Sequence, residues 1–167
     1  MDNFRQRIKN VLSIKKNLKI LAEYKSVPVI NASSKTRFTK RTYLGRNCKF
    51  NGIEIIGTGK VIIGDNFHSG EDILIMSSIH NYDNGATIPY DRKLISKDII
   101  IEDNVWVGAR VIILGGVKIG EGAIILDGSV VAKDIPKYAI ARGHPAEVFK
   151  YRDIDHYEKL KKEKKFF

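Results

Sequence analysis

Few side chains in this sequence have the types and spacing that catalysis requires. It holds no Gly-x-Ser-x-Gly nucleophile turn and no ligand spacing for zinc, and its single cysteine is Cys48. Histidine is the remaining candidate, because an imidazole accepts protons near neutral pH. The four histidines are His68, His80, His144 and His156. The chemistry open to this chain is therefore proton transfer by a histidine, and no bound metal is expected.

A six-residue period sets the positions of these side chains. Aliphatic residues recur every six positions from Ile101 to Val131, and a small or aliphatic residue follows each of them four positions later, from Val105 to Ile135. Gly, Asn and Asp, which favour tight turns, lie between them. The same phase extends upstream to Leu44, less regularly and with a one-residue slip.

Each six-residue unit is predicted to be a short strand followed by a tight corner. One unit cannot bury its apolar side alone, but stacked coils form a continuous aliphatic column. Because β-branched residues dominate and no 3.6-residue period is present, helix is excluded here. We predict an all-β parallel β-helix over residues 31–136, a basic helical segment at residues 1–30, and an extension with a short helix at residues 137–167.

The period is interrupted at roughly Asn81 to Leu94, a segment rich in polar and turn-forming residues. A loop that leaves a rigid solenoid is a typical place for function. His80 comes directly before it, where the last regular unit meets the loop. Asp83, or a backbone carbonyl, would orient the imidazole. Three loop residues are candidates for binding an acceptor: Asn81, Tyr82 and Arg92.

The formal net charge of +10 comes largely from the two ends of the chain. Aromatic residues are not interleaved with base-stacking spacing, so no nucleic-acid partner is expected. Residues 4–24 are predicted to form a basic amphipathic helix, which would cap the first coil or contact an anionic membrane surface. No apolar run of about 18 residues and no secretory leader are evident. Since Cys48 is the only cysteine, a cytoplasmic protein is the default prediction.

Residues 99–152 closely resemble the C-terminal half of hexapeptide-repeat acetyltransferases, especially the sugar O-acetyltransferases of the galactoside and maltose type. The motifs that carry the resemblance are NVWVGARV, GSVVAKDIP and GHPAEV, and weaker similarity extends over roughly residues 40–152. The resemblance implies a left-handed β-helix with about 18 residues per coil. It also implies a homotrimer that binds acetyl-coenzyme A between adjacent subunits.

By its place in this motif pattern, His80 takes the role of the family's catalytic histidine. It would be the general base for direct transfer of an acetyl group to a hydroxyl of a sugar or surface-glycan precursor. Within the family, the alternative is N-acetylation of a nucleotide-linked amino sugar. Outside it, the alternatives are a non-catalytic scaffold and a relative of the carbonic-anhydrase type.

The residues that bind acetyl-coenzyme A follow partly from spacing. Ala109 and Asp127 are one coil apart, and Ser77 would join their column if a 14-residue loop were removed. Asp127 stands where the family usually has a small residue. Backbone groups of Ala109 and Ala132 would bind the pantetheine amides. Two lysines are expected to bind the phosphates: Lys133 and Lys150.

Overall fold

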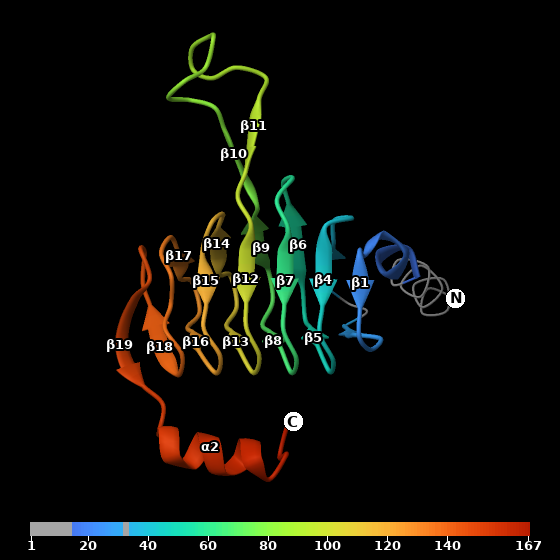
Figure 1. The fold of residues 1–167 in the computed structure, drawn as a ribbon, viewed down its shortest axis with the longest axis vertical. Helices are drawn as coiled ribbons and strands as arrows, with labels where there is room; N and C mark the ends of the chain where they lie inside the picture. Colours follow the sequence, from blue (N-terminus) through green and yellow to red (C-terminus); the bar gives the residue numbers. More distant parts are fainter. Residues whose placement is uncertain (1–14, 32–33) are drawn as a thin grey trace, which may run out of the picture.

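The computed structural model describes residues 15–31 and 34–167 and shows a solenoid of stacked coils (Figure 1). Each full coil contributes one short strand to each of three sheets, named here A, B and C. Sheet A consists of β1 (Glu23–Tyr24), β4 (Thr42–Leu44), β7 (Val61–Ile63), β12 (Ile99–Ile101) and β15 (Lys118–Ile119). Sheet C consists of β3 (Thr36–Arg37), β6 (Ile53–Ile56), β9 (Ile73–Met76), β14 (Ile112–Leu114) and β17 (Val130–Val131).

Sheet B is the longest of the three. It consists of β2 (Val29–Ile30), β5 (Lys49–Phe50), β8 (His68–Ser69), β13 (Trp106–Val107), β16 (Ile124–Ile125), β18 (Ala139–Arg142) and β19 (Glu147–Tyr151). Its strands pair in parallel except for β19, which is antiparallel to β18. The coils thus begin before residue 31 and continue past residue 136, the boundaries predicted from the period.

The inside of the solenoid is a column of aliphatic side chains. In sheet C, Ile55 pairs with Ile75, Ile75 with Ile113, and Ile113 with Val131. All four are at most 1% exposed. The six-residue period therefore marks the inward-facing positions, and the predicted parallel β-helix is confirmed.

Aromatic residues and the cysteine complete the core of the early coils. The ring of Phe50 lies between those of Phe38 and Phe67, with centroid distances of 5.1 and 5.5 Å. Cys48 is fully buried beside them. Burial raises the pKa of its thiol to about 11, so this thiol stays protonated and unreactive.

The corner between sheets A and B repeats an asparagine in three coils. Asn47, Asn66 and Asn104 all adopt a left-handed backbone, with φ of 53°, 57° and 59°, which asparagine tolerates better than most residues. Their side-chain amides form a ladder, with donor–acceptor distances of 3.0 and 2.8 Å. In the next coil Gly122 takes this position, with φ of 69°. A Cβ there would lie 2.9 Å from the ring of Tyr157, so close packing of the C-terminal helix requires glycine.

Carboxylates at the corners cap backbone N–H groups of the neighbouring coil. The N–H groups of Arg46, Lys60, Asp65 and Lys118 donate to Asp65, Asp98, Asp103 and Asp134, at 2.7–2.8 Å. Each carboxylate belongs to the coil that follows its donor. The acidic residues between the apolar positions therefore hold successive coils together.

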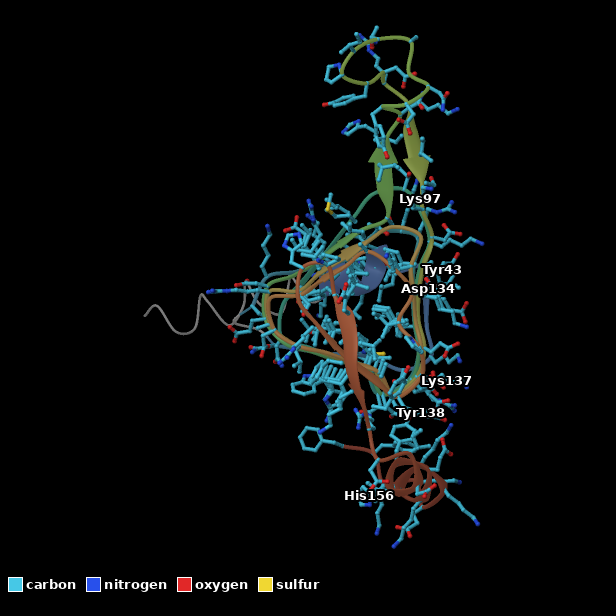
Figure 2. The ribbon with its side chains drawn as sticks, turned by 90° about the vertical axis from the view of Figure 1, so that its left-hand side faces the viewer. Tyr43, Lys97, Asp134, Lys137, Tyr138 and His156 are labelled. Carbon is cyan, nitrogen blue, oxygen red and sulfur yellow. The ribbon has the colours of Figure 1, made fainter. Side chains whose placement is uncertain are left out.

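The chain leaves the solenoid in a hairpin at the corner between sheets C and A. Its stem pairs β10 (Ser78–His80) with β11 (Leu94–Ser96) in antiparallel register, with Ile79 opposite Ile95. The hairpin projects away from the coils (Figure 1). Figure 2 shows Lys97 at its foot. The segment predicted to leave the solenoid, residues 81–94, forms the tip and the start of β11.

The helix α2 (Ile154–Lys162) lies on the opposite side of the solenoid from the hairpin (Figure 2). The Asp153 carboxylate caps its first turn by accepting from the N–H of His156. The guanidinium of Arg152 donates to the carbonyl of Gly122 at 2.6 Å. The ring of Tyr157 covers the same corner. These contacts attach α2 to the solenoid.

At the other end of the chain, residues 15–20 are helical and the coils follow from β1. Residues 4–14 of the amphipathic helix predicted over residues 4–24 lie outside the described residues. The prediction is wrong at its end, because residues 23–24 form strand β1 rather than helix. In the described part of the chain, no helix has the length and hydropathy to cross a bilayer.

Candidate active site

His80 is the last residue of β10, so the rigid stem of the hairpin fixes its backbone. Its side chain is exposed. The imidazole stacks on the ring of Tyr90, with centroids 3.9 Å apart and an interplanar angle of 19°. This stacking fixes the plane of the ring while leaving its nitrogens open to a ligand. The arrangement suits a base that takes a proton from a bound hydroxyl.

Asp91, rather than Asp83, is the carboxylate that organises the hairpin tip. It accepts hydrogen bonds from the N–H of Lys93 at 2.8 Å, the amide of Asn81 at 2.9 Å and the N–H of Ala86 at 3.3 Å. The N–H of Lys93, followed by the Asn81 amide and the Ala86 N–H, holds the pKa of Asp91 below its ordinary value. Asp83 is exposed, and no hydrogen bond joins it to His80 in the part of the chain that the structure describes.

The three predicted acceptor residues separate into two kinds. Asn81 is only 7% exposed, and its amide also donates to the carbonyl of Asn84 at 3.1 Å. It shapes the tip from within. Tyr82 and Arg92 are exposed and remain available to a ligand. The sequence interpretation missed Tyr90 and Asp91, although both lie in the loop that it marked as functional.

Ala109 and Asp127 stack at the corner between sheets B and C, as their spacing predicts. The carboxylate of Asp127 accepts a hydrogen bond from the N–H of Ala109 at 2.5 Å. The carbonyl of Ala109 accepts one from the N–H of Gly128 at 2.8 Å. Both backbone groups of Ala109 are therefore occupied. Asp127 is one more corner carboxylate of the kind that caps the other coils.

Ser77 does not join this column, so that prediction is wrong. Met76 pairs with Leu114, which carries Ser77 to the corner between sheets C and A. Neighbouring coils on either side of the hairpin are 38 residues apart, as in the pairing of Ile63 with Ile101. The excursion therefore adds 20 residues to an 18-residue coil, because its two-stranded stem lies outside the solenoid.

The remaining cofactor candidates lie at two places. Ala132 and Lys133 follow β17 at the corner between sheets C and A, the same edge of the solenoid from which the hairpin rises. Lys150 lies in β19 at the end of sheet B, opposite Ile140. All three are exposed. The two lysines would hold phosphate groups as point charges.

One chain does not bring all the candidate residues together. His80 and Lys133 belong to the edge between sheets C and A. The Ala109–Asp127 pair belongs to the edge between sheets B and C, and Lys150 to sheet B. A ligand that contacted all of them would have to reach more than one edge of the solenoid.

Comparison with known families explains the repeat. A family model described as the bacterial transferase hexapeptide, with six repeats, matches residues 98–133. Residues 98–133 therefore match the hexapeptide repeat of this family. This repeat indicates the left-handed form of the β-helix, which the six-residue period alone does not specify.

This chain is similar to several named acetyltransferases. It is 32% identical over 117 residues to the galactoside O-acetyltransferase of Lactococcus lactis, a match that covers 65% of this chain and 54% of the relative. The chain spans about half the length of the curated relatives it matches.

Solved structures show the same architecture. A maltose O-acetyltransferase from Clostridium difficile 630 superposes with a TM-score of 0.68 at 27% identity, over 83% of this chain and 74% of that one. A galactoside acetyltransferase in complex with coenzyme A superposes with a TM-score of 0.67 at 23% identity, over 91% and 84% of the two chains. At that identity the second similarity establishes the fold.

Proposed function

We propose that this protein is an acetyl-coenzyme A-dependent acetyltransferase that acetylates a hydroxyl of a sugar or surface-glycan precursor. The observation that carries the proposal is His80, an exposed imidazole held by Tyr90 on a hairpin that stands on a rigid hexapeptide-repeat solenoid. The sugar O-acetyltransferases among its relatives support the reaction and its acceptor class. The coenzyme A complex of a similar structure supports the donor.

In the proposed mechanism, His80 removes the proton of the acceptor hydroxyl as the oxygen attacks the thioester carbonyl. A tetrahedral intermediate forms, and hydrogen-bond donors around the carbonyl oxygen stabilise its negative charge. The C–S bond then breaks, and the departing thiolate takes up the proton held by the imidazole. The products are an acetyl ester and coenzyme A, so no covalent intermediate on the protein is required.

We propose that the working unit is a homotrimer. Within one chain, the hairpin with His80 and the Ala109–Asp127 corner lie at different edges of the solenoid. A second copy packed alongside would set the hairpin edge of one subunit against the Ala109 edge of the next. An extended pantetheine arm in that groove would reach His80 at one end, with Lys133 and Lys150 near its phosphates.

The test is thiol release from acetyl-coenzyme A across a panel of sugars, nucleotide-linked amino sugars and glycan fragments. We expect release with a hydroxyl sugar, and a loss of about 10²–10⁴-fold in turnover in His80→Ala. His156→Ala is the matched control, because this histidine is exposed on α2. Coenzyme A affinity, measured by calorimetry, should be nearly unchanged in both variants.

Three outcomes would redirect the proposal. Release only with amino sugars would favour N-acetylation. Equal turnover in His80→Ala and the parent protein would exclude His80 as the base. Failure to bind coenzyme A would exclude the acetyltransferase function itself.

A further inference from the structure

The outer face of sheet B carries a row of side chains that the proposed reaction does not use. Lys49 pairs with His68, and His68 pairs with Trp106, in adjacent parallel strands. Neighbouring strands lie about 4.8 Å apart, so these side chains are in contact range along the solenoid axis. Trp106 is 45% exposed, although it is a large apolar side chain on a strand. The row presents an aromatic face next to a cation.

The segment that follows α2 folds back over this row. The ring of Phe167 lies 5.5 Å from that of His68, and the Nζ atom of Lys49 lies 4.0 Å from the centroid of Phe167. The side-chain amide of Asn47 donates to the carbonyl of Phe167 at 3.2 Å. Hollows of about 450 and 370 Å³ lie against this ring, and both are lined by His68 and Trp106. Each is large enough for a sugar ring.

Lys49 is the cation of this row, and the ring of Phe167 covers it. Lys118 and Lys137 each pair with a glutamate elsewhere on the solenoid. Lys161, which lines the 370 Å³ hollow, pairs with Glu121. Among the described residues, by contrast, no carboxylate forms an ion pair with Lys49. Burial, followed by the charge of Lys49, lowers the pKa of His68 against the opposing hydrogen bond to Phe167.

We propose that this face binds an anionic sugar residue of the acceptor, with the pyranose ring against Trp106 and the negative group at Lys49. This inference rests on the proposed function, which identifies the ligand as the acceptor. Aromatic side chains offer large rigid contact surfaces with little loss of entropy. A few polar groups around them fix orientation, and the side chains of Asn51, Asn66 and Asn104 line the same hollows. The negative group is a carboxylate or a phosphate.

Trp106 is the only tryptophan in the chain, so its fluorescence reports on this site alone. The experiment titrates the protein with a hexuronic acid trisaccharide, its neutral methyl ester and a hexose phosphate, at low ionic strength. We expect a saturable change in emission with an anionic sugar and binding about three- to fivefold weaker for the neutral ester. The uronate and phosphate titrations distinguish the two anions.

Lys49→Gln should reduce the affinity for the anionic sugar by the same factor. Lys40→Gln, which removes one charge at the corner between sheets C and A, is the matched control. Circular dichroism verifies that both variants fold. Equal affinity for the acid and its ester, or equal effects of the two substitutions, would overturn the inference.

Thiol release separates this inference from the proposed function. Turnover of neutral sugars, without any response of Trp106 to anionic ones, would overturn the anionic site and leave the transferase. Binding at Trp106 in a protein that does not bind coenzyme A would leave a sugar site and remove its role as an acceptor site.

Discussion

The solenoid and the hairpin satisfy their polar groups in different ways. In the solenoid, partners come from the next coil, as in the ladder of Asn47, Asn66 and Asn104. In the hairpin tip they come from the tip itself, through Asn81 and Asp91. Each coil of the solenoid is therefore held by the coils next to it, whereas the tip beside the candidate base is held only by its own hydrogen bonds.

Burial differs in the same way. Ile75 and Ile113 are completely buried, whereas Ile88 and Leu94 in the hairpin are 99% and 45% exposed. Removing apolar atoms from the solenoid creates cavities, but the hairpin has almost no core to lose. This contrast separates substitutions that affect stability from those that affect function.

The largest effect on stability is expected for Ile113→Ala. It deletes buried methyl and methylene groups between Ile75 and Val131, and should reduce the free energy of unfolding by about 2–5 kcal/mol. Ile88→Ala is the control and should change it by less than about 0.5 kcal/mol. Urea denaturation measures both variants. Similar midpoints would contradict the expected difference between the buried solenoid and the exposed hairpin.

The next largest effect on stability is expected from acid. Burial raises the pKa of Glu121. The opposing effects are larger and bring the pKa below its ordinary value of 4.5: they are the hydrogen bond to Lys161, the Lys161 charge, the hydrogen bond to the Tyr157 hydroxyl and the Lys137 charge. A carboxyl with a lowered folded-state pKa contributes stability above its unfolded pKa and loses it as pH falls through the folded pKa. Stability should therefore decline below pH 4.5.

Unfolding measured between pH 7 and pH 3 tests this expectation. The Glu121→Gln variant should be less stable than the parent protein at pH 7, and the difference should shrink on acidification. A difference that stays constant with pH would assign the effect to packing.

A smaller and more local effect is expected for Asn81→Ala. It removes hydrogen bonds of 2.9 and 3.1 Å inside the hairpin tip, at a cost of about 1–2 kcal/mol. Because these contacts lie within the tip, we expect hydrogen exchange to accelerate at residues 81–93 while the sheets stay protected. Faster exchange throughout sheets A, B and C would show that the hairpin and solenoid open together.

The smallest effect on stability, about 1 kcal/mol, is expected for Asp127→Ala. This substitution frees the N–H of Ala109, which the carboxylate now occupies. Coenzyme A affinity should rise, because a backbone donor and a less negative groove become available. The control is Asp103→Ala, which removes the equivalent cap on Asp65. It should reduce stability as much as Asp127→Ala does but leave coenzyme A affinity unchanged. Calorimetry compares the two.

The sequence predicted the features that repeat and missed those that do not. The six-residue period marked Ile101, Ile113 and Val131 as core positions because the repeat forces each onto the inner face. It could not give the length of the excursion, since paired stem strands have no six-residue signal, and Ser77 was misplaced for that reason. Asp127 capping Ala109 and Asp91 organising the hairpin tip depend on side-chain reach, which spacing alone does not encode.

The C-terminal segment has a consequence for how the molecule unfolds. Solenoids ordinarily gain and lose repeats one at a time, because each coil contacts only its neighbours. Here α2 starts at the last coil and leads back beneath the earlier ones (Figure 1), and Asn47 holds the carbonyl of Phe167 across 120 residues of sequence. A contact of that span couples the fraying of one end to the other. The coils should therefore melt as one cooperative unit, and cutting the chain after Arg152 should turn a single sharp transition into a broad one.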